Sequence, residues 1–75
     1  MTLNEIFNGI RPGIDIDNSA DLVDDYTLDS FDVIVLISEI ERVYGITVTV
    51  NDIKIDNFRT KGAVIEMIER NGGVL

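Results

Sequence analysis

The residues of this sequence best suited to chemistry are three neighbours, Asp29, Ser30 and Phe31. A serine hydroxyl acts as a nucleophile when a nearby base removes its proton, and it can also accept a group that another enzyme transfers to it. The chain contains no histidine and no cysteine, so it lacks the usual general base and any thiolate. We therefore expect no catalysis by this chain and interpret Ser30 as a candidate modification site.

The residues around Ser30 also predict the start of a helix. Aspartate and serine are common at helix N-termini because their side chains accept hydrogen bonds from free backbone N–H groups. Asp29 fits the N-cap position, and Asp32 lies three residues later, as in a capping box. Capping alone explains the motif, but a helix N-terminus also accommodates a phosphate through its free N–H groups and its dipole. The local sequence thus permits a phosphate-linked group on Ser30 without requiring one.

The helix that starts after Asp29 is expected to run to about Tyr44 and to be the central element of the fold. Its apolar positions 33, 36, 37, 40 and 44 share one face at helical spacing, and positions 31, 34 and 35 widen that face. Gly45 is typical of a left-handed helix end. Six large apolar side chains are predicted to lie in the core: Phe7, Phe31, Ile34, Ile40, Phe58 and Ile68.

Two further helices are predicted on either side of the central one. The first begins with a capping box formed by Thr2 and Glu5, and it ends before Arg11-Pro12-Gly13 because proline disfavours helix at the residue before it. The last begins after Thr60 and runs through Arg70. Both have apolar residues at helical spacing, which indicates that each packs one face against the rest of the domain.

The connections between the helices complete the predicted fold. Residues 13–28 are expected to form an ordered acidic loop, residues 46–50 an extended connector, and residues 51–58 to contain one short helical turn. The expected fold is all-α, a single domain over residues 1–75 built as a small four-helix bundle with three principal helices and one short helix. Four apolar side chains are expected to hold the acidic loop to the core: Ile14, Leu22, Val23 and Leu28.

Negative charge is concentrated in one half of the chain. The net charge is −8, and no basic residue lies between Arg11 and Arg42, a stretch with nine acidic residues. Such a field repels nucleic acid and anionic lipid and attracts basic protein surfaces. The alternative is that the acidic residues only keep a small protein soluble. No signal peptide is visible, and the longest apolar run, residues 33–37, is too short to span a membrane. We expect a soluble, cytoplasmic monomer without nucleic-acid or membrane partners.

The acidic loop matches part of the pattern of a calcium-binding loop. Asp15, Asp17 and Ser19 occupy the first three ligand positions of an EF-hand pattern. The pattern then fails, because Ala20 stands at the glycine position and Tyr26 at the bidentate glutamate position. We predict no specific metal site, while weak, non-specific cation binding by the loop stays open.

The run Leu28-Asp29-Ser30-Phe31-Asp32, at the start of an acidic helix, resembles the phosphopantetheine attachment motif of acyl carrier proteins, in which Asp-Ser-Leu is usual. The likeness extends over nearly the whole chain. Residues 31–41 and Tyr44-Gly45-Ile46 resemble the second helix of that family and its exit. Asn57-Phe58 and Thr60 are similar to the junction between the third and fourth helices. The chain therefore resembles the acyl carrier protein family, which includes D-alanyl and peptidyl carrier proteins.

The resemblance implies that Ser30 carries a covalent phosphopantetheine arm, with an acyl or aminoacyl group held as a thioester on its terminal thiol. It implies a phosphopantetheinyl transferase, a loading ligase, and acyltransferases or synthases with basic patches as partners. Fatty-acid, polyketide, nonribosomal peptide and D-alanine systems all remain open. Core residues would also line any small acyl cavity. Asp29 and Phe31 would flank the attachment point, and partners would contact residues of the central helix: Asp32, Val35, Glu39 and Glu41.

Two residues depart from the family pattern. Phe31 replaces the usual leucine and keeps the position apolar, so attachment is expected to survive. Val35 stands where fatty-acid carriers often present an acid, which favours a dedicated partner such as an adenylating ligase. The alternative from another class is an unmodified acidic interaction module that shares only the carrier fold.

Overall fold

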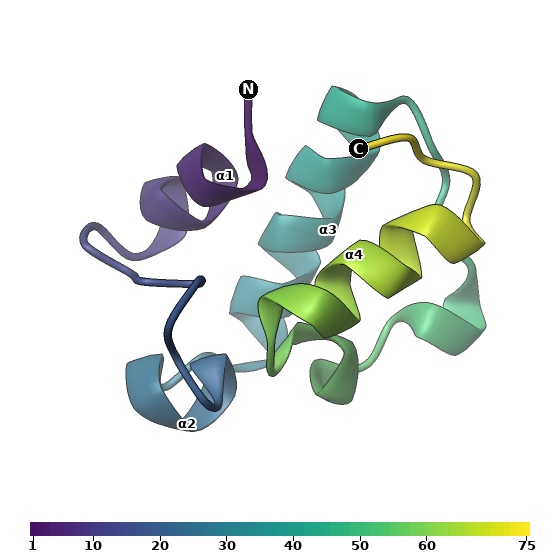
Figure 1. The fold of residues 1–75 in the computed structure, drawn as a ribbon. Helices are drawn as coiled ribbons and strands as arrows, with labels where there is room; N and C mark the ends of the chain where they lie inside the picture. The colour runs from purple at the N-terminus through teal and green to yellow at the C-terminus, as the bar shows by residue number, and fades with distance from the viewer.

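The structure, a computed structural model that describes residues 1–75, consists of helices and connecting segments without any strand (Figure 1). Three longer α-helices and one short one follow each other along the chain: α1 (Leu3–Ile10), α2 (Leu22–Tyr26), α3 (Ser30–Tyr44) and α4 (Lys61–Arg70). Two short 3₁₀ helices, η1 (Val50–Asp52) and η2 (Ile55–Phe58), lie between α3 and α4. The prediction of an all-α bundle is confirmed. No helix has both the length and the apolar character needed to cross a membrane.

The helix ends follow from local sequence. Thr2 Oγ1 accepts a hydrogen bond from the backbone N–H of Glu5, and the Glu5 carboxylate accepts one from the backbone N–H of Thr2, which is a complete capping box. Gly45 ends α3 with φ of 65°, a backbone conformation that glycine adopts without steric cost. Thr60 Oγ1 caps α4 by accepting from the N–H of Ala63. All three ends are where the sequence predicts them.

The core is one cluster of 17 buried apolar residues, and α3 runs through its middle. The side chains of α3 that face the cluster are spaced three or four residues apart, as one face of a helix requires: Val33, Leu36, Ile37 and Ile40. Figure 1 shows α1 and α4 on either side of this helix. Four of the six predicted core residues are confirmed, each at most 1% exposed: Phe7, Ile40, Phe58 and Ile68.

The acidic loop is ordered as predicted, but it also contains regular secondary structure that the sequence did not predict. The four apolar anchors expected there are buried, and so is Ile16. The loop also contains α2, which the sequence analysis did not find; its N-cap is Asp21, whose side chain accepts from the N–H groups of Val23 and Asp24. Five residues are too few for a recognisable apolar stripe. The sequence predicts one short helical turn within residues 51–58. The structure has η2 there and a second short helix, η1, which begins at Val50, the last residue of the predicted extended connector.

The prediction that Phe31 and Ile34 lie in the core is wrong. Phe31 is 72% exposed and Ile34 is 56% exposed. Successive residues of an α-helix are turned by about 100°, so these two lie roughly 100° or more from the direction that Val33 and Leu36 face. The apolar surface of α3 is wider than the core can cover. We call Phe31 and Ile34 the exposed apolar face of α3.

Candidate modification site

Ser30 is the first residue of α3 and is exposed. The backbone on both sides of it is held by a capping box, because Asp29 Oδ1 accepts from the N–H of Asp32 at 2.9 Å and Asp32 Oδ2 accepts from the N–H of Asp29 at 3.2 Å. The N–H groups of Ser30 and Phe31 donate to no protein acceptor. The site thus combines an accessible hydroxyl, two free backbone donors and a rigid backbone.

Asp32 is placed differently from the other predicted partner contacts. Its residue is only 8% exposed, and its carboxylate forms a two-bond ion pair with the Arg11 guanidinium, at 2.7 Å and 3.4 Å. Arg11 comes from the end of α1, so the pair joins two helices. The Asp32 carboxylate is thus bound within the bundle, and its contact with partners stays a prediction.

The exposed apolar face begins directly beside the hydroxyl. Phe31 follows Ser30 in the chain, and Ile34 lies about one helical turn further along α3. Isolated exposed apolar residues are common, but two large ones next to a candidate reactive group provide a surface that another protein can recognise.

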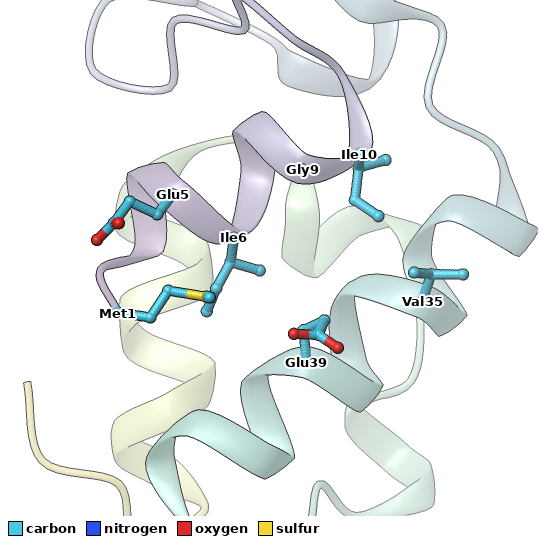
Figure 2. A pocket seen from close by; sticks show the side chains of 7 residues that line it. All are labelled: Met1, Glu5, Ile6, Gly9, Ile10, Val35 and Glu39. Atoms are coloured by element: carbon cyan, nitrogen blue, oxygen red, sulfur yellow. The ribbon is translucent and has the colours of Figure 1, made fainter.

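Val35 and Glu39 line a groove between α1 and α3 (Figure 2). The groove has a volume of about 270 Å³, and Val35 is half-buried in its wall. Figure 2 shows Glu39 on α3 across from α1. Its carboxylate also pairs with Arg42 at 2.6 Å. None of the six predicted core residues lines this groove, so it is separate from any cavity expected among them.

Glu41 has a structural contact of its own. Its carboxylate accepts a hydrogen bond from the N–H of Val48 at 2.9 Å, which ties α3 to the extended connector. Val48 is buried and Ile46 partly buried, so this connector packs against the core. Contact with partners stays a prediction for Val35, Glu39 and Glu41.

The loop that matches part of a calcium-binding pattern has internal partners for its carboxylates. Asp15 accepts from the N–H groups of Asp17 and Asn18, and Asp17 pairs with Lys61 at 2.6 Å. The hydrogen bond from Lys61 lowers the pKa of Asp17. No group of three or more carboxylates is arranged to hold a metal ion.

Two arginines that sequence reasoning did not single out organise the acidic half of the chain. Arg11 holds Asp32, as described above. Arg59 lies within 4 Å of three carboxylates, with its Nη1 2.9 Å from Asp21 and its Nε 2.8 Å from Asp56. These contacts raise the pKa of Arg59, the bond to Asp56 most. No local signal identifies such pairs, because Arg11 and Asp32 are 21 positions apart and Arg59 and Asp21 are 38 apart.

The comparisons with known proteins agree with this geometry. Residues 4–68 match the model of the family described as phosphopantetheine attachment site, a range that covers most of the chain and includes Ser30. No curated protein and no solved structure matches the chain. Members of this family hold phosphopantetheine covalently and act as carriers. The extent of the match, together with the helical fold, shows that the chain belongs to the phosphopantetheine-binding carrier proteins of the acyl carrier type.

Proposed function

We propose that this protein carries acyl or aminoacyl groups as thioesters on a phosphopantetheine arm attached to Ser30. The observation that carries the proposal is the position of Ser30, exposed at the first residue of α3 inside the matched region. The alternative, an unmodified acidic interaction module, has no observation of its own in its favour.

The residues at the start of α3 fit a phosphate-linked group. The N–H groups of Ser30 and Phe31 are free to donate, and the dipole of a 15-residue helix favours negative charge at this end. The carboxylate of the preceding residue, Asp29, accepts through its Oδ1 from the N–H of Asp32. When bound, the arm supplies the thiol that a chain without cysteine lacks.

The chain's contribution to attachment is to present a nucleophile that another enzyme activates. A base of the transferase takes the proton of the Ser30 hydroxyl, whose oxygen then attacks the β-phosphorus of coenzyme A. The new oxygen–phosphorus bond replaces the bond to the leaving group, adenosine 3′,5′-bisphosphate. No histidine is available in the chain itself, so base and metal must come from the transferase.

We further propose a dedicated loading enzyme, such as an adenylating ligase, over the standard enzymes of fatty-acid synthesis. Phe31 and Ile34 are exposed, Val35 replaces a common acid, and the Asp32 carboxylate is internal. The start of α3 therefore presents more apolar surface and less free charge than an acidic recognition helix. An apolar partner surface matches it better than a purely basic one.

Intact mass spectrometry tests the assignment of Ser30. The apo-protein is incubated with coenzyme A and a promiscuous phosphopantetheinyl transferase, and we expect the mass to increase by one arm. Ser30→Ala is expected to abolish the increase. Ser38→Ala is the matched control, because Ser38 is also an exposed serine of α3, and it should be modified like the wild type.

Two outcomes contradict the proposal. No increase in mass with several transferases would favour the unmodified interaction module. An increase that persists in Ser30→Ala would place the arm on another residue.

A further inference from the structure

Arg11 has a fixed place in the structure before its side chain makes any contact. Its backbone N–H donates to Phe7 O and its carbonyl accepts from the N–H of Ile14, both at 3.0 Å. It is the C-cap residue of α1, and α1 packs on α3. The guanidinium therefore reaches Asp32 from a rigid base. The backbone of Arg11 therefore loses no freedom when the pair forms, and only side-chain freedom is lost.

The contacts of Asp32 continue to the residue before Ser30. Its Oδ2 accepts from Arg11 Nη2 at 2.7 Å and also from the N–H of Asp29 at 3.2 Å. Asp29 in turn accepts from the N–H of Asp32 at 2.9 Å. A continuous set of bonds thus leads from the end of α1 to both residues of the capping box that encloses Ser30.

A capping box on the surface is normally held by two weak bonds alone, and helix ends fray. Here the Asp32 side chain is 12% exposed and fixed by the planar, two-bond geometry that arginine forms with a carboxylate. The side chain of Asp32 cannot rotate away from the Asp29 N–H without breaking the ion pair. The start of α3 is therefore restrained by a residue from another helix.

We propose that Arg11 is a positioning residue for the modification of Ser30, acting through Asp32 to hold the first turn of α3 in the conformation that the transferase uses. This inference rests on the proposed function, because it takes Ser30 as the attachment point. Arg11 does not touch the reacting hydroxyl in the structure. Its role is to keep the Ser30 backbone in one orientation, since small errors of placement slow a reaction strongly.

Steady-state kinetics of modification test this role, with apo-protein as the varied substrate at saturating coenzyme A. For Arg11→Gln we expect kcat to fall about tenfold, with a smaller change in KM, because a tilted nucleophile binds the transferase but reacts slowly. Arg11→Lys should recover only part of kcat, since lysine keeps the charge but not the two-bond geometry. Circular dichroism sets a temperature at which every variant is folded.

The matched control is Arg70→Gln. Arg70 pairs with Asp52 at 2.9 Å, in an arginine–aspartate pair of similar burial at the C-terminal end of α4. Its loss should lower stability comparably but leave kcat within about twofold of the wild type, because the pair does not contact the start of α3. An equal fall of kcat in Arg70→Gln would overturn the positioning role.

A double-mutant cycle tests the route through Asp32. Asp32→Asn alone should lower kcat like Arg11→Gln, and the double variant should be no slower than either single variant. Multiplied losses would show that Arg11 acts by another path. A wild-type kcat in Arg11→Gln would overturn the proposal directly.

Amide hydrogen exchange in the unmodified protein gives a second readout. The N–H groups of Asp29 and Asp32 should exchange faster in Arg11→Gln while core amides of α3 are unchanged; unchanged exchange at both sites would overturn the proposal. Failure of the proposed function and failure of the positioning role give different results. If the wild type is not modified, both the proposed function and the role that rests on it are refuted. Unaltered variants of a modified wild type refute the positioning role alone.

Discussion

The buried and exposed faces of α3 are alike in composition and opposite in use. Leu36 and Ile40 are fully buried and pack within the core, whereas Phe31 and Ile34 are 72% and 56% exposed beside the candidate attachment serine. Both faces consist of large apolar side chains on one helix. One face holds the bundle together, and the other is free to meet another protein. Hydrophobicity alone does not tell which apolar residues of a helix the fold buries and which it leaves exposed.

The two faces also differ in what surrounds them. The buried face packs against α1 and η2, and its residues share the core cluster with residues of α4. The start of the exposed face is framed by polar bonds, namely the capping box and the pair of Arg11 with Asp32. Each face can therefore be perturbed separately.

The largest effect is expected on the buried face. Leu36→Ala should lower the free energy of unfolding by about 2–5 kcal/mol, because removal of the buried leucine side chain leaves a cavity in the core. Urea denaturation measures the loss. If that variant does not fold, Ile40→Val should still cost about 0.5–1.5 kcal/mol. A change below about 0.5 kcal/mol for Leu36→Ala would show that the core is not packed around this residue.

On the exposed face, Ile34→Ser should change the free energy of unfolding by no more than about 0.5 kcal/mol. It should instead raise the transferase KM for the apo-protein about fivefold, the size expected for one apolar interface contact of about 1 kcal/mol. Val50→Ser is the matched control, because Val50 is 84% exposed but lies in η1. Equal KM changes in both variants would contradict recognition through α3.

The approach to α3 contains the one strained residue other than glycine. Thr27 has φ of 52°, in the left-handed region that a β-branched residue rarely adopts. Thr27→Gly should raise the free energy of unfolding by about 0.5–1 kcal/mol, as relief of strain exceeds the added chain entropy. Thr47→Gly, at an exposed residue without positive φ, should lower it. A destabilised Thr27→Gly would mean that the threonine side chain makes a contact worth more than the strain.

The smallest effect is expected on the pH dependence of stability, because apolar contacts contain no titratable group whereas ion pairs do. The hydrogen bond from Arg70 lowers the pKa of Asp52 below its ordinary value of 3.8. A carboxyl with a lowered folded pKa stabilises the protein above its unfolded pKa and loses that contribution as pH falls through the folded value.

Unfolding of the wild type and of Asp52→Asn should therefore be compared from about pH 5 down to about pH 3. The difference in free energy of unfolding between the two proteins should become smaller as the pH falls. A difference that stays constant would show that the charge of Asp52 contributes nothing.

Local features of this fold are readable from the sequence because their partners are three or four residues apart. The capping boxes of Thr2 with Glu5 and of Asp29 with Asp32 are both present as predicted, and Gly45 ends α3. The same proximity made Ser30 recognisable as an exposed helix start. The family resemblance drew on these features together and is confirmed by the match over residues 4–68.

The burial of a residue cannot be read locally, because it depends on which other elements of the chain pack over it. The sequence predicts one wide apolar surface on α3, and only packing decides which part is buried, because the neighbouring α1 and η2 cover a limited arc of the helix. The short α2 is hidden in an acidic segment and depends on its N-cap and on the buried Leu22 and Val23.

By itself, then, the sequence determined the three longer helices, their ends and the serine at the start of α3. Tertiary structure decided that Phe31 is exposed, that Asp32 is internal, and that Arg11 pairs with Asp32 from another helix. The physical reason is distance along the chain. Capping bonds join residues within one turn, whereas Arg11 and Asp32 meet only after α1 has packed against α3.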